Sequence, residues 1–354
     1  MHGPSPATSR KREVTLRQIA AEAQVDVATV SRALACEPGV GQERAEQIRT
    51  LAQVMGYRPR PLRRRRTDAI GLVVRSWHPD RIDHGYLQRV VYQAELAAAD
   101  TGRHVHLHRV RGDSPEGEWP RFISENRVDG VVVLGHGTAG FYERLKREPI
   151  PAVAVNDTIA RTGIDSVMCD PAPGVADAIR RLIDLGHRQV GLVVTQLEFP
   201  TVRSRYDTYL RTLQEAGITP QLGWIIEDSP VGIRGGQQAV KTYIAAGRPP
   251  SAILFNDDWV AMGGIYELAR QGYRIPDDVS VVGYDNTAIA EDLSPSLSSI
   301  DNREGEVIRQ AFAMLQDRMD GVAGPPQQQT VPSRLVWRES CARVASTADG
   351  EAAL

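Results

Sequence analysis

The chain has few of the residues that mark a secreted, metal-binding or membrane protein. Its three cysteines, Cys36, Cys169 and Cys341, are odd in number and far apart, and no C-x-x-C pair occurs. Neither a disulfide framework nor a zinc site is therefore indicated. No stretch approaches the ~18 consecutive apolar residues of a membrane span, and Met1–Lys11 lacks the apolar core of a signal peptide. We expect a cytoplasmic protein with no membrane partner.

Motifs of common enzyme chemistries are also missing. Neither a G-x-S-x-G turn nor a P-loop occurs, and the glycines at Gly135–Gly137 and Gly263–Gly264 indicate a nucleotide cofactor only weakly. The alternating histidines of His104–His108 would share one face of a strand. A metal site is one interpretation; a strand with Val105 and Leu107 inward and the histidines outward is the preferred one. The sequence predicts no enzyme, no catalytic residue, no metal and no cofactor.

Charge is divided unevenly along the chain. Residues 1–66 carry thirteen Lys and Arg against six Asp and Glu, a balance of +7, whereas the remainder carries 29 against 38, a balance of −9. The whole-chain net charge of −2 hides this division. A basic segment on an acidic body is the electrostatic pattern of a nucleic-acid-binding protein.

The basic segment begins with three expected helices. Thr15 and Gln18 form a T-x-x-Q capping-box pattern at the start of the first helix. After a short turn, Asp26 can cap a second helix over Val27–Leu34, with Val27 among its inward residues, and a third amphipathic helix is expected over Gly41–Met55. Two short helices joined by a tight turn and closed by a third predict a helix-turn-helix head that binds double-stranded DNA.

From Ala69 onward, strand-like apolar runs alternate with helix-length segments. Strands are expected at Ile70–Val74, Val105–Val110, Gly130–Leu134, Ala152–Val155, Val190–Val194, Ala252–Phe255 and Val279–Tyr284, and helices at Leu87–Thr101, Gly174–Leu185, Tyr206–Ala216, Gly235–Ala246 and Val260–Gln271. This alternation predicts an α/β body of parallel sheets with helices on both faces, in two halves that divide near residues 155–165. A ligand would bind between the lobes, outside the carboxyl ends of the strands.

The run VTLRQIAAEAQV followed by ATVSRAL resembles the DNA-binding head of the lac repressor (LacI/GalR) family of bacterial regulators. Six further segments, among them NRVDGVVVL, DLGHRQVGLV and IPDDVSVVGYD, resemble its effector domain in the family's order. The resemblance implies a helix-turn-helix head and a two-lobe periplasmic-binding-protein-like body. It also implies a homodimeric repressor whose affinity for a pseudo-palindromic operator changes when a small polar effector, a sugar or related metabolite, binds.

The resemblance also suggests domain boundaries. They are a tail at 1–13, the head at 14–58, a basic linker or hinge at 59–68, the effector-binding and dimerisation domain at 69–340, and a second tail at 341–354. Two other classes of function stay open: an α/β enzyme acting on sugars, and a sugar-binding transport component. Salt-dependent binding to a pseudo-palindromic duplex would separate the regulator from both.

In the head, Arg32 is the strongest candidate for reading a base, because a guanidinium can bridge guanine O6 and N7; a phosphate contact or a plain surface charge is the alternative. By resemblance, Val27 and Ala28 hold positions that select the operator; for Val27, a place in the core is the alternative. Four further residues match phosphate-contacting positions, with helix capping or an ordinary surface hydroxyl as the alternative: Thr15, Thr29, Ser31 and Tyr57.

Six arginines follow the head between residues 58 and 66. In the family this segment forms a hinge helix ending in a leucine that enters the minor groove. Leu62 holds that place when counted back from Thr67, but four residues are missing when counted forward from Tyr57, and Pro59 and Pro61 resist helix formation. An extended arginine arm is therefore the favoured alternative. The expected DNA contacts here are Leu62, Arg63 and Arg64.

In the body, the resemblance assigns effector binding to polar residues that follow strands or open helices: Asn156, Arg205, Asp257 and Asp285. An Arg and Asp pair can grip vicinal hydroxyls or a carboxylate; an ion pair between the lobes is the alternative. Four aromatic residues could supply a face for a sugar ring, with an ordinary core position as the alternative for each: Trp77, Tyr86, Phe199 and Trp259. Arg75 and Glu304 would add charge near the cleft, which suggests an effector other than a plain neutral sugar.

Overall fold

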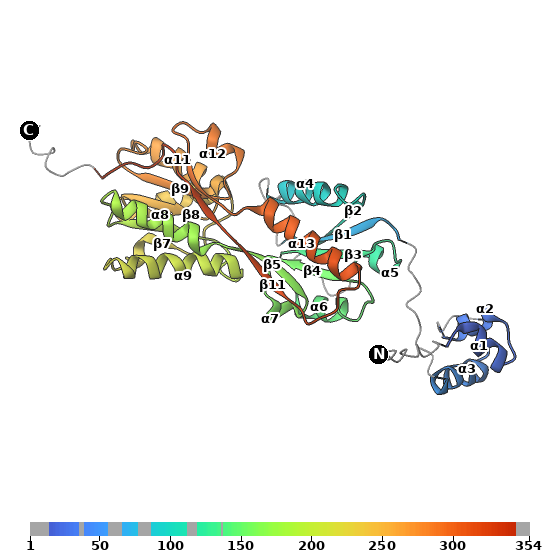
Figure 1. The fold of residues 1–354 in the computed structure, drawn as a ribbon. Helices are drawn as coiled ribbons and strands as arrows, with labels where there is room; N and C mark the ends of the chain where they lie inside the picture. The colour runs from blue at the N-terminus through green and yellow to red at the C-terminus, as the bar shows by residue number, and fades with distance from the viewer. Residues whose placement is uncertain are drawn as a thin grey trace, which may run out of the picture. The chain divides into compact units, whose positions relative to one another are not determined.

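The computed structural model describes residues 14–34, 39–55, 66–76, 86–111, 119–135 and 137–344. The chain divides into two compact units, Met1–Arg65 and Arg66–Leu354, which are treated separately below (Figure 1). In the described part of the chain, no helix is long and apolar enough to cross a membrane.

The first unit is a three-helix head of α1 (Leu16–Glu22), α2 (Val27–Leu34) and α3 (Gln42–Val54). The predicted capping box is confirmed, because the Thr15 hydroxyl accepts from the Gln18 N–H while the Gln18 side chain accepts from the Thr15 N–H. The helices share one core, whose fully buried members are Ile19, Ala20, Val30, Ala33, Ala45, Ile48 and Ala52. The expectation that Val27 packs inward is wrong: it is 40% exposed, and α2 buries Val30 and Ala33 instead.

The second unit contains two six-stranded sheets. The first has the order β11-β5-β4-β3-β1-β2, with all pairs parallel. Its strands are β1 (Ala69–Ser76), β2 (His104–Arg111), β3 (Gly130–Leu134), β4 (Ala152–Val155), β5 (Asp165–Asp170) and β11 (Gln328–Pro332). We call this sheet and the helices on it the N-lobe.

The second sheet has the order β12-β10-β9-β8-β6-β7 and is parallel except for β12. Its strands are β6 (Val190–Val193), β7 (Ile225–Ile226), β8 (Ala252–Phe255), β9 (Ser280–Tyr284), β10 (Ser298–Asp301) and β12 (Arg334–Val336). We call this sheet and its helices the C-lobe. The predicted class, parallel sheets flanked by helices behind a helix-turn-helix head, is confirmed.

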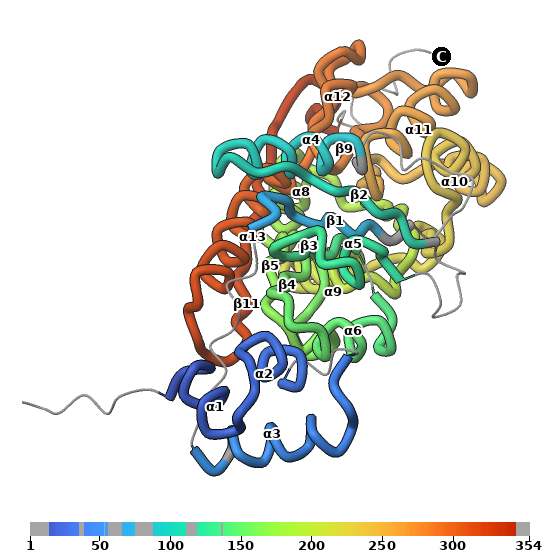
Figure 2. The backbone as a smooth tube through the Cα atoms, turned by 90° about the vertical axis from the view of Figure 1, so that its right-hand side faces the viewer, coloured from blue at the N-terminus to red at the C-terminus, as the bar shows by residue number. Residues whose placement is uncertain are grey.

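Helices cover both faces of each sheet. In the N-lobe, α4 (Tyr86–Ala99) and α13 (Glu304–Met319) bury one face, and α5 (Arg121–Ser124) and α6 (Ala139–Leu145) the other, as Figure 2 shows. In the C-lobe, α8 (Ala172–Asp184) and α9 (Pro200–Glu215) lie opposite α10 (Ile233–Ala245) and α11 (Asp258–Arg270). Shorter helices are α7 (Ile159–Thr162), η1 (Leu222–Trp224) and α12 (Ala288–Asp292).

The chain passes between the lobes three times: after β5, between β10 and α13, and between β11 and β12. The first passage lies later than the expected division at 155–165, because β5 adds to the N-lobe sheet before the chain leaves it. The sequence analysis missed β5, β10, β11, β12 and the sixteen-residue α13. The last three return to a lobe that the chain had already left, an arrangement that local apolar periodicity does not reveal.

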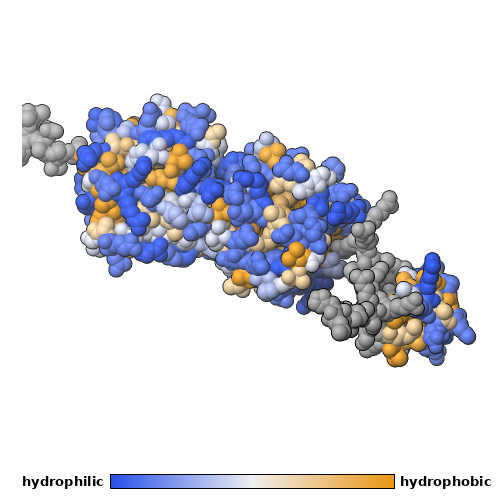
Figure 3. All heavy atoms as spheres, viewed as in Figure 1, coloured by the Kyte–Doolittle hydropathy of each residue, from blue (hydrophilic) through white to orange (hydrophobic). Residues whose placement is uncertain are grey.

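The visible face of the molecule is mostly hydrophilic, with small hydrophobic patches (Figure 3). Three large apolar side chains are exposed on neighbouring elements of the N-lobe: Tyr92 at 58% and Leu96 at 44% on α4, and Leu107 at 52% on β2. The expectation that Leu107 points inward is therefore wrong. β2 lies at the edge of its sheet, where a side chain can stay open to solvent beyond the reach of the described helices.

Candidate DNA-binding head and effector site

The second helix of the head begins at a well-formed cap. The Asp26 carboxylate accepts from the Thr29 N–H at 2.7 Å and from the Thr29 hydroxyl at 2.8 Å, as expected of an N-cap residue. These hydrogen bonds hold the pKa of Asp26 below its ordinary value. The hydroxyls of Thr15 and Thr29 are thus both engaged in helix caps, which is the alternative to a phosphate contact.

The exposed face of α2 carries the expected recognition residues. Val27, Ala28 and Arg32 are exposed, and Ser31 is half-buried, so these four side chains reach the surface of one short helix. Four of the expected DNA contacts, Tyr57, Leu62, Arg63 and Arg64, lie outside the described residues.

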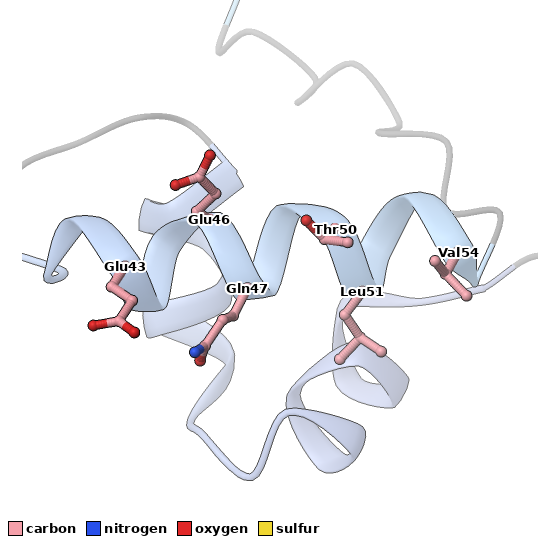
Figure 4. Close-up of a pocket in the computed structure, with 6 residues that line it drawn as sticks. All are labelled: Glu43, Glu46, Gln47, Thr50, Leu51 and Val54. Atoms are coloured by element: carbon pink, nitrogen blue, oxygen red, sulfur yellow. The ribbon is translucent and has the colours of Figure 1, made fainter.

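A shallow pocket of about 490 Å³ lies on the outer face of α3. Figure 4 shows the side chains that line it, from Glu43 at one end to the 79%-exposed Val54 at the other. Glu43 and Glu46 give this face negative charge, which repels phosphate. This pocket is therefore poorly suited to contact a phosphate backbone, and the exposed side of α2 stays the predicted DNA-binding face.

In the body, Arg205 of α9 is held among C-lobe strand ends. Its Nη1 donates to the Asn256 carbonyl just after β8 at 2.7 Å. Its guanidinium lies 3.5 Å from the centroid of the Tyr284 ring at the end of β9, a cation–π arrangement. Among the described residues, neither the buried Arg205 Nε nor the buried Asn256 Oδ1 has a hydrogen-bond partner. A donor and an acceptor are thus left unused at the carboxyl ends of β8 and β9.

Asp285 follows β9 with a positive φ of 93° and connects to both lobes. It accepts from the Asn302 amide at 2.8 Å and lies 3.9 Å from Nη2 of Arg89 on α4. Burial raises the pKa of Asp285 to about 7, although Arg205 and Arg89 act to lower it. A direct ion pair between Arg205 and Asp285 is absent from the described structure; the charge partner is Arg89, which the sequence analysis did not identify.

Arg89 also clamps Glu304, the first residue of α13. Its Nε and Nη2 donate to the two carboxylate oxygens of Glu304 at 2.5 and 3.1 Å, a bidentate geometry. Burial raises the pKa of Glu304 above its ordinary value, while Arg89 opposes that change. Because Arg89 contacts both carboxylates, this ion pair places Glu304 near Asp285, as the position of Glu304 in the sequence suggested.

Asp257 and Asp258 have separate roles at the start of α11. Asp257 caps the helix by accepting from the Val260 N–H at 2.8 Å. Asp258 is fully buried and accepts from the Thr287 N–H at 2.6 Å, the Thr287 hydroxyl at 2.9 Å and the Ser299 hydroxyl at 2.6 Å. Burial raises the pKa of Asp258 to about 6 against these hydrogen bonds. Asp258 therefore ties the start of α11 to Thr287, two residues after Asp285, and to Ser299 of β10.

The remaining expected effector residues are more scattered. Asn156 has a left-handed backbone after β4, and its Oδ1 accepts from the Cys169 N–H at 3.0 Å. Trp259 is half-buried on α11. Trp77 lies outside the described residues, and of Tyr86 only the backbone, at the start of α4, is described. Arg205, Asp257 and Asp285 therefore lie together with three residues that the sequence analysis missed: Arg89, Asn256 and Asn302. These six residues are called the effector cluster below.

The turn after β3 carries a G-x-G-x-x-G spacing from Gly135 to Gly140, which in dinucleotide-binding proteins admits a pyrophosphate. Here packing explains the middle glycine: a Cβ at Gly137 would lie 2.3 Å from the Tyr142 ring. The buried Tyr142 hydroxyl in turn donates to Asp157 at 3.2 Å. The glycine spacing thus accommodates a core tyrosine.

No group of three or more His, Cys, Asp or Glu suited to a metal ion occurs among the described residues. His106 and His108 lie edge-on to the Phe122 ring, with centroids 6.3 and 6.1 Å away. These histidines therefore pack beside an aromatic side chain on the sheet.

Comparison with known proteins supports the two-lobe architecture described above. The sequence profile described as "Periplasmic binding protein-like domain" matches residues 179–341. The HTH-type transcriptional repressor CytR of Escherichia coli (strain K12) is 26% identical over 320 residues, covering 89% of this chain and 92% of CytR.

Solved structures show the same fold. A transcriptional regulator CelR–cellobiose complex is similar with a TM-score of 0.70 and 24% identity, over 93% of this chain and 100% of that one. The lac repressor dimer bound to operator and the anti-inducer ONPF is similar with a TM-score of 0.67 and 22% identity, over 94% and 100%.

A helix-turn-helix head joined to a two-lobe periplasmic-binding-protein-like body is the architecture of the transcription regulators to which this chain is similar. Over about nine tenths of its length the chain is similar to transcription regulators of the LacI/GalR type, among them CytR, PurR and the ribose operon repressor.

Proposed function

We propose that this protein is a homodimeric repressor that binds a pseudo-palindromic operator and responds to a small polyhydroxylated effector, a sugar or sugar derivative. The effector binds at the Arg205–Asn256–Asp285 cluster. CelR has been solved with cellobiose and the lac repressor with operator, which supports both halves of the proposal. A repressor acts where the chromosome lies, so we place it in the cytoplasm.

One observation carries the effector assignment. The unpartnered Arg205 Nε is a donor, the unpartnered Asn256 Oδ1 is an acceptor, and the two residues are joined by the 2.7 Å bond from Arg205 Nη1 to the Asn256 carbonyl. A hydroxyl group is both an acceptor and a donor, so the hydroxyls of a polyhydroxylated ligand can satisfy both kinds of atom. Buried polar atoms without partners cost about 1–3 kcal/mol each, so a ligand hydroxyl that satisfies both gains affinity here.

The contact between Arg89 and Asp285 gives the effector a means of control. It joins α4 of the N-lobe to the end of β9 in the C-lobe at 3.9 Å. An effector that binds Asp285 competes with Arg89 for the same carboxylate and so favours one arrangement of the lobes. Such unequal binding to two states is what changes operator affinity.

Domain organisation and dimerisation follow the same proposal. The head spans 14–58, the linker 59–68, and the effector-binding and dimerisation domain 69–340. The exposed Tyr92, Leu96 and Leu107 supply an apolar surface for a second copy. Sedimentation of the full-length protein should give a dimer, and Leu96→Lys should shift it toward monomer.

The experiment is operator selection followed by an effector screen. Duplexes selected by the full-length protein should be pseudo-palindromic, and a sugar that stabilises the protein in a thermal-shift screen should change operator affinity. Arg205→Ala should abolish that change while operator binding persists. A variant that still responds normally would move the effector site elsewhere, and absence of salt-dependent duplex binding would favour an enzyme or a transport component.

A further inference from the structure

A second cavity, of about 200 Å³, lies between α4 and α13 of the N-lobe. Apolar side chains of α13, including Phe312, Leu315 and Met319, form one side of its lining. These three residues begin eight positions after Glu304, about 12 Å along a helix. The cavity is therefore separate from the effector cluster.

The polar side of this cavity contains a guanidinium held in a fixed position. Arg103 Nη1 donates to the Gln316 Oε1 at 2.6 Å, and Gln316 Nε2 donates to Asp320 at 2.6 Å. The Arg103 Nε is buried and has no hydrogen-bond partner. The edge of the guanidinium formed by Nε and Nη2 is thus oriented by its neighbours but engages no acceptor in the described structure.

Elsewhere in this protein the same edge of arginine holds a carboxylate. Arg318 donates from Nε and Nη2 to Asp165 at 2.6 and 2.9 Å, and Arg274 donates from Nε and Nη2 to Asp278 at 2.9 and 2.7 Å. This planar, two-pronged geometry matches a carboxylate, which is the partner of the arginine in both of these pairs. The Nε–Nη2 edge of Arg103 is available in the same way, but no carboxylate pairs with it in the described structure.

The other charged residues of the lining do not supply that carboxylate. Arg309 is already engaged, through Nη2 to Glu306 at 2.8 Å and through Nε to the Gly305 carbonyl at 3.2 Å. Asp100 lies exposed at the end of α4, so its charge is screened by solvent. Among the described residues that line the cavity, the cation left without a carboxylate partner is Arg103.

We propose that this cavity binds a small apolar carboxylate, one six-membered ring in size. Its ring lies against Phe312, Leu315 and Met319, and its carboxylate pairs with the Nε–Nη2 edge of Arg103. The volume agrees with this class, because an apolar cavity of ~150 Å³ accepts benzene and the additional space accommodates a carboxyl group. This site is independent of the proposed function, and its failure would leave the effector site and operator binding untouched.

The test is calorimetric titration of the full-length protein with benzoate and with its uncharged analogue benzamide. Benzoate should bind saturably at one site per chain, and benzamide about tenfold more weakly or worse, because a hydrogen-bonded charge is removed. Arg103→Met should weaken benzoate by a similar factor. Arg309→Met, at an arginine already paired with Glu306, is the matched control and should change affinity by less than about threefold.

A second variant keeps the test decisive if Arg103→Met fails to fold. Ala313→Phe at the exposed rim of the cavity should block benzoate without disturbing the core. Arg205→Ala should bind benzoate normally. The proposal is overturned if benzoate does not bind, if benzamide binds equally well, if Ala313→Phe leaves affinity unchanged, or if Arg205→Ala removes it.

Discussion

Arg89 of α4 donates two hydrogen bonds to Glu304 and lies 3.9 Å from Asp285. One guanidinium therefore contacts both the start of α13 in the N-lobe and the end of β9 in the C-lobe. Bidentate pairing fixes the position of Arg89 relative to Glu304, so a change at Asp285 is transmitted to a helix of the other lobe. In the proposed function, this geometry is what links effector binding at Asp285 to the arrangement of the lobes.

Asp285 should make stability depend on pH in a defined direction. Its pKa in the folded protein is about 7, above the ordinary value of 3.8, so the folded state holds the proton more tightly than the unfolded chain. The stabilisation that the protonated Asp285 contributes to the unfolding free energy is complete below pH ~4. It falls by a few kcal/mol in total as the pH rises from ~4 to ~7, and it does not change further above pH ~7.

Asp285→Asn removes this decline and should raise the unfolding free energy at pH 7.5 relative to the unmodified protein while abolishing the effector response. Urea unfolding between pH 5 and 8 measures it, with Asp277→Asn, at an exposed carboxylate, as the control. A destabilised Asp285→Asn at pH 7.5 would show that the charged pair with Arg89 outweighs burial.

Arg32→Ala should weaken operator binding by roughly 1–3 kcal/mol and relax preference at one base pair, because no guanidinium then bridges the base edge. Gel-shift titrations on the selected operator and on a random duplex measure the difference. Arg17→Ala, at an exposed arginine of α1, should affect both duplexes alike. Equal losses on both duplexes for Arg32→Ala would leave Arg32 as a phosphate contact.

Replacing Arg63–Arg66 with Gln should flatten the plot of log K against log salt, by about 0.9 for each phosphate that is no longer neutralised. Leu62→Ala distinguishes an extended arm from a hinge helix. An apolar wedge in the minor groove kinks DNA, so its removal should reduce both affinity and bending. Unchanged bending supports the arm, whereas a helix across Pro59–Arg64 with Leu62 between base pairs would refute it.

Gly263→Ala should destabilise the C-lobe, because a Cβ at Gly263 would lie 2.0 Å from the Ile233 carbonyl oxygen of the adjoining helix α10. Forced separation of packed elements costs typically about 1–3 kcal/mol or more. Gly223→Ala is the control, since no atom lies within 4 Å of its added Cβ. Thermal unfolding of the two variants gives the comparison, and a Gly263→Ala protein as stable as the control would show that α10 and α11 can move apart freely.

Local features could be read directly from the sequence. The capping box at Thr15 and Gln18, the Asp26 cap and the β-α alternation depend on residues a few positions apart, so their spacing specifies them. Resemblance added Arg205 and Asp285, which lie in one cluster in the structure. Val27 and Leu107 were placed wrongly because apolar residues on a short helix or an edge strand do not reveal which face is covered.

Contacts between distant segments were decided only by the tertiary structure. Arg89 and Glu304 are 215 residues apart, and their pairing requires α13 to return to the lobe that contains α4. The partnerless atoms of Arg205 and Asn256, and the free edge of Arg103, exist only because sheet order and packing bring some groups together and leave others unmatched. The sequence by itself determined the helices of the head, the β-α alternation through β9 and the class of protein. The three passages between the lobes determined the site, because local periodicity does not encode which strands become neighbours.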